Sequence, residues 1–146
     1  LRSLDVPQAG RPLPTTLELL METLSEFYFA ARSAFPALAE KTDRAFVKYW
    51  GEPPTEAGAY SWFGSVSTAL NNEMQKGSFL SESETFFAFV RQALQQGNPE
   101  VKNCIDVSFV ENLFWQVSPQ KAAPYWHALP AELQQLYIGF HGSSPL

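Results

Sequence analysis

Apolar side chains recur at steps of three and four residues along most of this 146-residue chain. Phe63, Val66, Leu70 and Met74 illustrate the pattern, which places them on one face of a helix. No segment alternates apolar and polar residues for long enough to predict a strand, and no repeat of fixed period occurs. The pattern therefore predicts an all-α fold: a single compact domain of about five to seven helices, orthogonal or bundle-like in arrangement.

Prolines, glycines and capping residues indicate where these helices begin and end. Thr15 with Glu18, and Ser81 with Glu84, have the spacing of a capping box, in which hydroxyl and carboxylate accept hydrogen bonds from amides at a helix start. Pro36 is expected to end or bend the first helix, because proline lacks an amide and disfavours a helix before it. The later helices are predicted over residues 42–51, 81–97, 99–117, 119–128, 130–142 and from about 59 to 76, with Thr42 or Asp43 capping the first and Gly51, Gly77 and Gly97 as stops.

Prolines also separate a first segment from the helical domain. Residues 1–14 contain Pro7, Pro12 and Pro14 and are predicted to be extended, since each proline fixes φ and lacks a donor. Residues 15–146 are predicted to form one helical domain. A chain of this size, 45% apolar, buries roughly 68–70% of the surface that its unfolded form exposes, so we expect one self-sufficient core.

Two carboxylates, Asp106 and Glu111, stand among the apolar residues of the stretch over 104–119, most of which belongs to the predicted helix over 99–117. Five residues apart on a helix, they do not face each other, so they are not an acid and base pair. Asp106 is expected near the helix start, where a carboxylate caps amides and favours the helix dipole. Glu111 is expected at the edge of the apolar face or partly buried with one specific hydrogen bond, a structural role in either case.

The sequence contains no pattern typical of a catalytic or metal-binding site. His127 and His141 lie 14 residues apart across Pro130, which excludes the spacing of a zinc-binding helix. His127 is expected to be packed or to cap a helix, and His141 to favour a helix C-terminus. Cys104 precedes an apolar run and is expected to be a buried, inert thiol. We therefore predict no enzyme activity, no cofactor and no metal.

Charge and cysteine content limit the partners and the compartment. Ten Lys and Arg against 15 Asp and Glu give a net charge of −5, and the basic residues are scattered singly, so nucleic acid is not expected to bind. A single cysteine fits a reducing compartment, for which the cytoplasm is the default. No apolar run approaches the roughly 18 residues that a membrane span needs. The sequence sets no oligomeric state.

Two surface features are candidates for binding a partner. Glu18, Glu22 and Glu26 recur at four-residue steps on the predicted first helix and form either a solvated acidic face or a docking strip for a basic partner. Aromatic side chains near predicted helix ends are the second candidate, since such rings are difficult to bury fully and are favoured at interfaces. They are Trp50, Tyr60, Trp62, Trp115, Tyr125 and Trp126, of which Trp115 and Trp126 are the predicted binding residues.

The order of elements between residues 83 and 116 resembles a known group of proteins. A phenylalanine-rich helix, SETFFAFVRQAL, precedes GNPEVKNCIDVSFVENLFWQ, and this order is similar to that of small, all-helical bacterial proteins that resemble immunity proteins encoded beside polymorphic or secreted toxins. The similarity spans roughly residues 15–117 and leaves 118–146 uncovered. It consists of packing and turn residues, so it assigns no functional residue.

The resemblance implies an immunity protein, which binds one cognate toxin in the bacterial cytoplasm and blocks its active site. An acidic protein suits a basic toxin surface, because complementary charge speeds encounter. Two alternatives stay open from the sequence. In the first alternative, the chain is an adaptor or effector chaperone that binds a secreted protein. In the second, it is a small hydrolase that uses Glu111 or His127.

Overall fold

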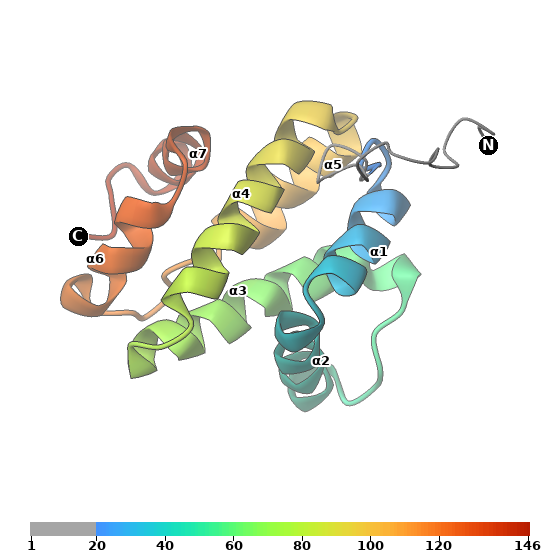
Figure 1. Ribbon diagram of the computed structural model, residues 1–146, viewed down its shortest axis with the longest axis horizontal. Helices are drawn as coiled ribbons and strands as arrows, with labels where there is room; N and C mark the ends of the chain where they lie inside the picture. The colour runs from blue at the N-terminus through green and yellow to red at the C-terminus, as the bar shows by residue number, and fades with distance from the viewer. Residues whose placement is uncertain (1–19) are drawn as a thin grey trace, which may run out of the picture.

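The helical periodicity produces an all-α fold, as predicted. The computed structural model describes residues 20–146, which contain seven α-helices and no strand (Figure 1). The α-helices are α1 (Leu24–Ala34), α2 (Pro36–Trp50), α3 (Ala59–Lys76), α4 (Leu80–Gln96), α5 (Pro99–Cys104), α6 (Pro119–Ala128) and α7 (Ala131–His141). A short 3-10 helix, η3 (Glu56–Gly58), precedes α3, and a π-helix, η4 (Ile105–Val110), continues α5.

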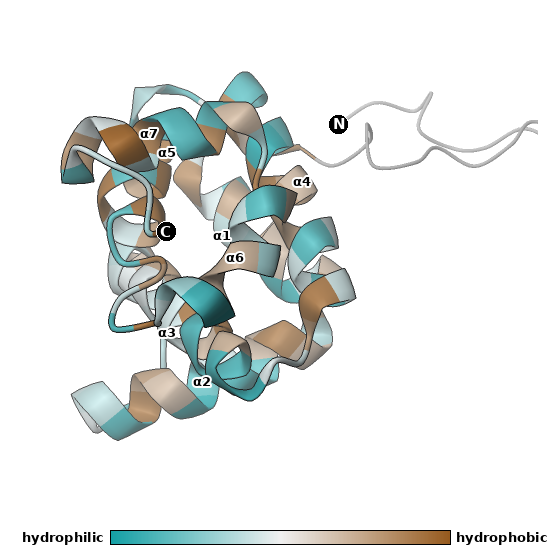
Figure 2. Cartoon of the chain, turned by 90° about the vertical axis from the view of Figure 1, so that its left-hand side faces the viewer, coloured by the Kyte–Doolittle hydropathy of each residue, from teal (hydrophilic) through white to brown (hydrophobic). Residues whose placement is uncertain are grey.

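Helices α3 and α4 run through the middle of the molecule. Helices α1 and α2 lie on one side of them and α6 and α7 on the other, while α5 lies behind α4 in the view of Figure 1. Figure 2 shows apolar and polar residues within the same helices, as expected of helices that bury one face and expose the other. None of the helices in the described part of the chain is long and apolar enough to cross a membrane.

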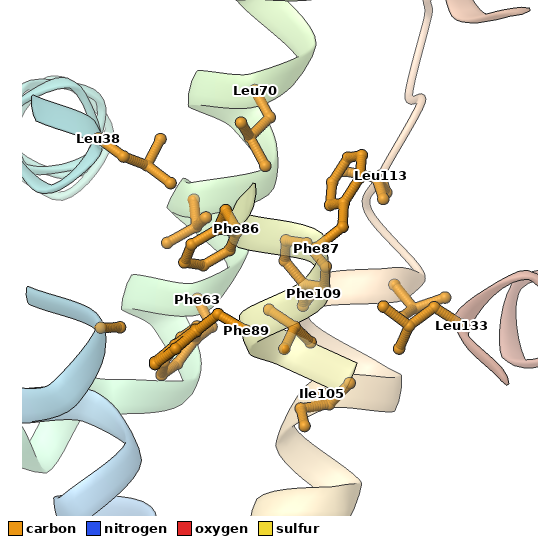
Figure 3. Close-up of a cluster of buried hydrophobic side chains, with 14 of the residues drawn as sticks. Leu38, Phe63, Leu70, Phe86, Phe87, Phe89, Ile105, Phe109, Leu113 and Leu133 are labelled. Atoms are coloured by element: carbon orange, nitrogen blue, oxygen red, sulfur yellow. The ribbon is translucent and has the colours of Figure 1, made fainter. Parts of the chain in front are cut away.

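The core is built largely from aromatic rings. Phe63 of α3, Phe86 and Phe89 of α4, and Phe109 of η4 point into one buried cluster from different helices (Figure 3). Phe27 stacks on Phe63 with the ring centroids 4.3 Å apart. Packed rings bury large apolar areas and add a specific geometric attraction. This cluster therefore joins the first helices to the later ones.

The first helix begins later than predicted. Helix α1 starts at Leu24, and residues 20–23 are not helical, so a helix running on from Thr15 is wrong over these residues; Thr15 and Glu18 lie outside the described ones. The capping box is made by Thr23 and Glu26, whose side chains accept hydrogen bonds from each other's amides at 3.2 and 3.1 Å. The sequence holds the T-x-x-E pattern twice, and the second copy satisfies this helix start.

The second helix begins earlier than predicted. Helix α2 starts at Pro36, directly after Phe35 interrupts the helical backbone, as expected for the residue before a proline. Neither Thr42 nor Asp43 is a cap, because both lie inside this helix. Thr42 is buried, and Asp43 binds neighbouring helices instead. The predicted stop at Gly51 is confirmed by its left-handed backbone.

The fourth helix starts at another residue than predicted, and the glycine that ends it is required for close packing. Phe79, in the left-handed conformation, caps α4, so Ser81 and Glu84 already lie within the helix and form no capping box. Gly97 ends α4 as predicted, but with an extended backbone. A Cβ on Gly97 would lie 2.5 Å from the side chain of Val101 and 2.8 Å from the carbonyl oxygen of Ala93. Close approach of α5 therefore requires this glycine.

The helix boundaries at the C-terminus agree with the prediction to within one residue. Ser118 caps α6, which begins at Pro119, and its hydroxyl accepts from the amide of Lys121 at 3.4 Å. Helix α7 follows Pro130 and ends at Gly142, which has a left-handed backbone. Gly77 ends α3 in the same way.

A polar junction joins the first three helices. The guanidinium of Arg32 in α1 donates to both carboxylate oxygens of Asp43 in α2, at 2.8 and 2.9 Å. The indole N–H of Trp62 in α3 donates to the same carboxylate at 2.8 Å. Arg32 also lies 5.6 Å from the ring centre of Tyr28 and 5.4 Å from that of Trp62. Asp43 thus fixes the positions of three helices.

We expect Asp43→Asn to lower the free energy of unfolding by about 1–3 kcal/mol near neutral pH, since charged hydrogen bonds are lost. Burial opposes ionisation of Asp43, but the hydrogen bonds from Arg32 and Trp62 prevail and lower its pKa below the ordinary 3.8. A carboxyl group with a lowered pKa stabilises the folded state at pH values above its ordinary pKa. This stabilisation is lost as the pH falls through the folded-state pKa.

Urea unfolding at several pH values measures this difference between the two proteins. It should be constant above about pH 5 and shrink below pH 4. Glu40→Gln is the matched control, because Glu40 forms only an exposed pair with Arg44 at 3.4 Å and should change stability little. A difference for Asp43→Asn that does not depend on pH would contradict the prediction.

We expect Thr42→Val to raise the free energy of unfolding by about 1 kcal/mol. The Thr42 hydroxyl is fully buried and has no hydrogen-bond partner among the described residues. Valine has nearly the same shape without the buried polar group. Thermal unfolding measures the effect, and Thr85→Val, at an exposed position of α4, is the control. Equal changes in the two variants would show that the buried hydroxyl is not the cause.

Candidate functional site

The chain departs from regular helix between Ile105 and Gln116. Residues 105–110 form η4, in which the amide of Glu111 donates to the carbonyl oxygen of Asp106 at 3.1 Å, and residues 111–116 form consecutive turns. Phe114 and Gln116 have positive φ angles of 67° and 56°. The prediction of one continuous helix to residue 117 is therefore wrong. π-Helices and strained non-glycine residues are both frequent at functional sites.

Three side chains of α3 hold this irregular segment in place. Ser67 donates to the carbonyl oxygen of Phe109 at 2.6 Å, and Gln75 donates to that of Gln116 at 2.8 Å. Between them, Asn71 donates to the carbonyl oxygen of Asn112 at 2.9 Å and accepts from the amide of Phe114 at 2.8 Å. Ser67, Asn71 and Gln75, which we call the α3 polar ladder, are four residues apart and share one helix face.

Trp115 is exposed because of this arrangement. The two left-handed residues, Phe114 and Gln116, flank it in sequence. Phe114 points into the core, where it packs against Trp126 at a centroid distance of 5.8 Å. Trp115 points outward and is 68% exposed. A large exposed ring at a strained and well-supported backbone position is typical of a binding residue.

Two more aromatic side chains stand at the end of α2. Tyr49 is 79% exposed and Trp50 is 50% exposed, and their rings meet edge to face at 5.0 Å. Trp50 also leans on buried Phe46, at a centroid distance of 6.2 Å. Gly51 ends the helix directly after them, so the pair occupies its last turn. The Trp50 ring is therefore held against the core, and the Tyr49 ring packs against that of Trp50.

These rings line a cleft between α2, α3 and the irregular segment. Tyr60 forms part of its wall and is itself fixed, since its hydroxyl accepts from Asn103 at 3.0 Å and donates to the carbonyl oxygen of Glu100 at 3.4 Å. The cleft has a volume of about 510 Å³. Its lining residues, which define the aromatic cleft, are Ala45, Tyr49, Trp50, Tyr60, Ser61, Gly64, Ser65, Thr68, Val107, Ser108, Asn112 and Trp115. None of them carries a charge.

A larger hollow, of about 920 Å³, lies on the surface of α1 and α2. It is shallow, and its polar groups are largely paired with one another. Arg32 binds Asp43 in the junction described above, and Arg44 pairs with Glu40 at 3.4 Å. Because the first of these pairs joins α1 to α2 and the second is an exposed pair within α2, we regard the aromatic cleft as the better candidate site.

The titratable residues considered from the sequence do not come together in a reactive arrangement. Burial raises the pKa of the Cys104 thiol to about 12, which suits an inert cysteine. The imidazole Nε2 of His141 lies 3.1 Å from the carbonyl oxygen of Glu111, so Glu111 is bound through its backbone. His127 is exposed, so of its two predicted roles the packed one is wrong; it lies in the last turn of α6. Among residues 20–146, no group of three His, Cys, Asp or Glu is placed to hold a metal ion.

Asp106 does not cap a helix. Asn98 caps α5 instead, and its side chain accepts from the amide of Val101 at 3.0 Å. Because α5 already begins at Pro99, Asp106 lies seven residues further on, inside η4, and is too far from the helix start to cap it.

The predicted binding residues have different environments. Glu18 lies outside the described residues, exposed Glu22 precedes α1, and the carboxylate of Glu26 is used in the capping box, so the described part of the acidic stripe does not run along a helix. Trp126 is only 7% exposed, because it packs against Phe114 and Tyr137. Its ring is therefore not free to bind a partner, whereas Trp115 is.

Sequence reasoning identified Trp50, Tyr60 and Trp115 as rings near helix ends, but it missed Tyr49. The signal available was its position beside Trp50 and before Gly51, in the last turn of a helix. Trp62 and Tyr125, which were also candidates, belong to the core.

We expect Asn71→Ala to lower the free energy of unfolding by about 2–4 kcal/mol, because the amide of Phe114 and the carbonyl of Asn112 would both lose a partner. Asn72→Ala, at the exposed neighbouring position, is the matched control and should change stability little. Chemical denaturation followed by tryptophan fluorescence measures both variants. If Asn71→Ala were as stable as Asn72→Ala, the α3 polar ladder would not support the irregular segment.

Comparison with known proteins gives a family. Residues 30–142 match a family described as "Domain of unknown function (DUF7674)". No curated protein and no solved structure matches the chain. The matched residues include the α3 polar ladder and every residue that lines the aromatic cleft. The chain therefore belongs to the DUF7674 family.

Proposed function

We propose that this protein is a non-catalytic binding module and that the aromatic cleft is its partner-binding surface. The observation that carries the proposal is the exposure of Tyr49, Trp50 and Trp115 around one cleft. Tryptophan and tyrosine are the residues most enriched among those that dominate binding energy at protein interfaces. Exposed rings on a fixed backbone also lose little conformational freedom on binding.

The chemistry of the lining supports binding rather than catalysis. Among residues 20–146, the lining of the cleft offers hydroxyl, amide and indole groups but no carboxylate, imidazole, thiol or amine. General acid and base catalysis needs a titratable group within hydrogen-bond reach of the reacting atoms. The alternative of a hydrolase using Glu111 or His127 has no support from this lining, since neither residue belongs to it.

The partner in this proposal is a cognate bacterial toxin, which the protein neutralises in the cytoplasm by covering its active site. The support is the resemblance of residues 15–117 to immunity proteins and the net charge of −5, which favours encounter with a basic surface. The second candidate is an adaptor or effector chaperone, which would use the same cleft without inhibiting its partner.

Substitution of the acidic residues in the N-terminal region would test this proposal less clearly than substitution of residues in the cleft. The carboxylate of Glu26 accepts from the amides of Glu22 and Thr23, so reversing its charge would also damage the start of α1. Any loss of binding would then have two causes. Trp115 is free of this problem, because its side chain is mainly exposed.

We expect Trp115→Ala to weaken binding to the natural partner at least tenfold, which corresponds to about 1.4 kcal/mol. The partner would be captured from the native host on the immobilised full chain, purified, and its affinity measured for each variant. Phe140→Ala is the matched control, since Phe140 is also an exposed ring, at 57%, but lies outside the cleft lining. Circular dichroism should show both variants folded.

An activity assay on the captured partner separates the two candidate functions. Addition of the protein should suppress the partner's activity if it is an immunity protein and leave it unchanged if it is an adaptor. Equal affinities for Trp115→Ala and the unmodified protein would exclude the aromatic cleft as the binding surface.

A further inference from the structure

We propose that the aromatic cleft binds a proline-rich segment of its partner in the polyproline II conformation. The inference rests on the proposed function and adds the class of ligand to it. It is carried by the juxtaposition of two tryptophans and a tyrosine, whose polar groups make no hydrogen bond to residues 20–146, with small uncharged residues in the same lining.

Three rings of the cleft present hydrogen-bond donors that have no partner among the described residues. Within the part of the chain that the structure describes, the indole N–H groups of Trp50 and Trp115 and the hydroxyl of Tyr49 make no hydrogen bond. An indole N–H can only donate. The best ligand for such a surface is one rich in free acceptors, and each ring also offers an apolar face beside its donor.

A proline-rich segment has this chemistry. Proline has no amide N–H, and a polyproline II helix makes no internal hydrogen bonds, so its carbonyl oxygens are free acceptors. Its rings are apolar and pack against aromatic side chains. Because the conformation is already ordered before binding, little entropy is lost, which suits a small cleft with few anchors.

The other common modes of peptide recognition fit this cleft poorly. Addition of a strand needs a sheet edge, and residues 20–146 contain no strand. Recognition of phosphorylated or acidic peptides needs arginine or lysine, and the lining has neither. An amphipathic helix needs an apolar groove, whereas Ser61, Ser65, Thr68 and Ser108 make part of this lining polar.

The walls of the cleft are also preorganised. Trp115 follows Phe114, whose amide is held by Asn71, and precedes Gln116, whose carbonyl is held by Gln75. Trp50 rests on Phe46, and the hydroxyl of Tyr60 is bound to α5. A cleft whose backbone is held in place matches a stiff ligand, because little of either partner must be ordered on binding.

The test is titration of the purified full chain with decaproline, acetylated and amidated at its ends, by calorimetry and tryptophan fluorescence. We expect saturable binding that Trp115→Ala and Trp50→Ala each weaken at least tenfold. Trp115→Phe keeps a ring but removes the donor and should weaken binding about threefold. Phe140→Ala should leave it unchanged. A neutral glycine and serine decapeptide, which offers the same carbonyls on a flexible chain, should not bind.

Three outcomes would overturn the inference: no binding of decaproline, equal binding by Trp115→Ala, or binding of a neutral oligosaccharide such as cellohexaose in its place. Circular dichroism on each variant separates a loss of binding from a loss of fold. A failure of this inference can also be distinguished from a failure of the proposed function. If capture of the natural partner needs Trp115 but decaproline does not bind, the cleft is the binding surface and its ligand is not proline-rich.

Discussion

The backbone of residues 105–116 can leave regular helix only if its polar groups find partners elsewhere, because a buried amide or carbonyl without a partner costs about 1–3 kcal/mol. The α3 polar ladder supplies those partners. Asn71 is the central member, since it both donates to and accepts from the irregular segment. Helix α3 also packs on α2. The same helix therefore sets both walls of the aromatic cleft.

This support determines how the neighbouring aromatic residues are used. With Phe114 in the left-handed conformation, its ring joins Trp126 and Tyr137 in a buried cluster, while Trp115 is directed to solvent. A left-handed conformation costs a non-glycine residue roughly 1–2 kcal/mol, which the hydrogen bonds from Asn71 and Gln75 offset. Strain and exposure thus occur at adjacent residues, as is common where a fold holds a side chain ready for a ligand.

The sequence predicts the regular helices well because their signals are local. Each signal determines the helix within a few residues of itself. These signals are the apolar spacing, the prolines Pro36, Pro119 and Pro130, and the glycine stops Gly51 and Gly77. The irregular segment is different, since Ile105, Phe109 and Leu113 also have helical spacing and the deviation depends on side chains about 40 residues earlier. For the same reason, the sequence could not distinguish exposed Trp115 from buried Trp126. Tertiary contacts alone decide which ring faces solvent.

The distribution of charge fits a surface that uses different forces for encounter and for specificity. The chain has a net charge of −5, yet none of the described residues that line the aromatic cleft is charged. Arg32 and Asp43 are engaged in holding helices together. Under the proposed function, the net charge would act at long range on the rate of association, which salt screens beyond about 8–10 Å. The neutral rings would act only at contact and determine how long the complex lasts, because apolar burial and indole hydrogen bonds change dissociation more than association. Partners of the same charge would then be distinguished by the shape and acceptors of the segment that enters the cleft.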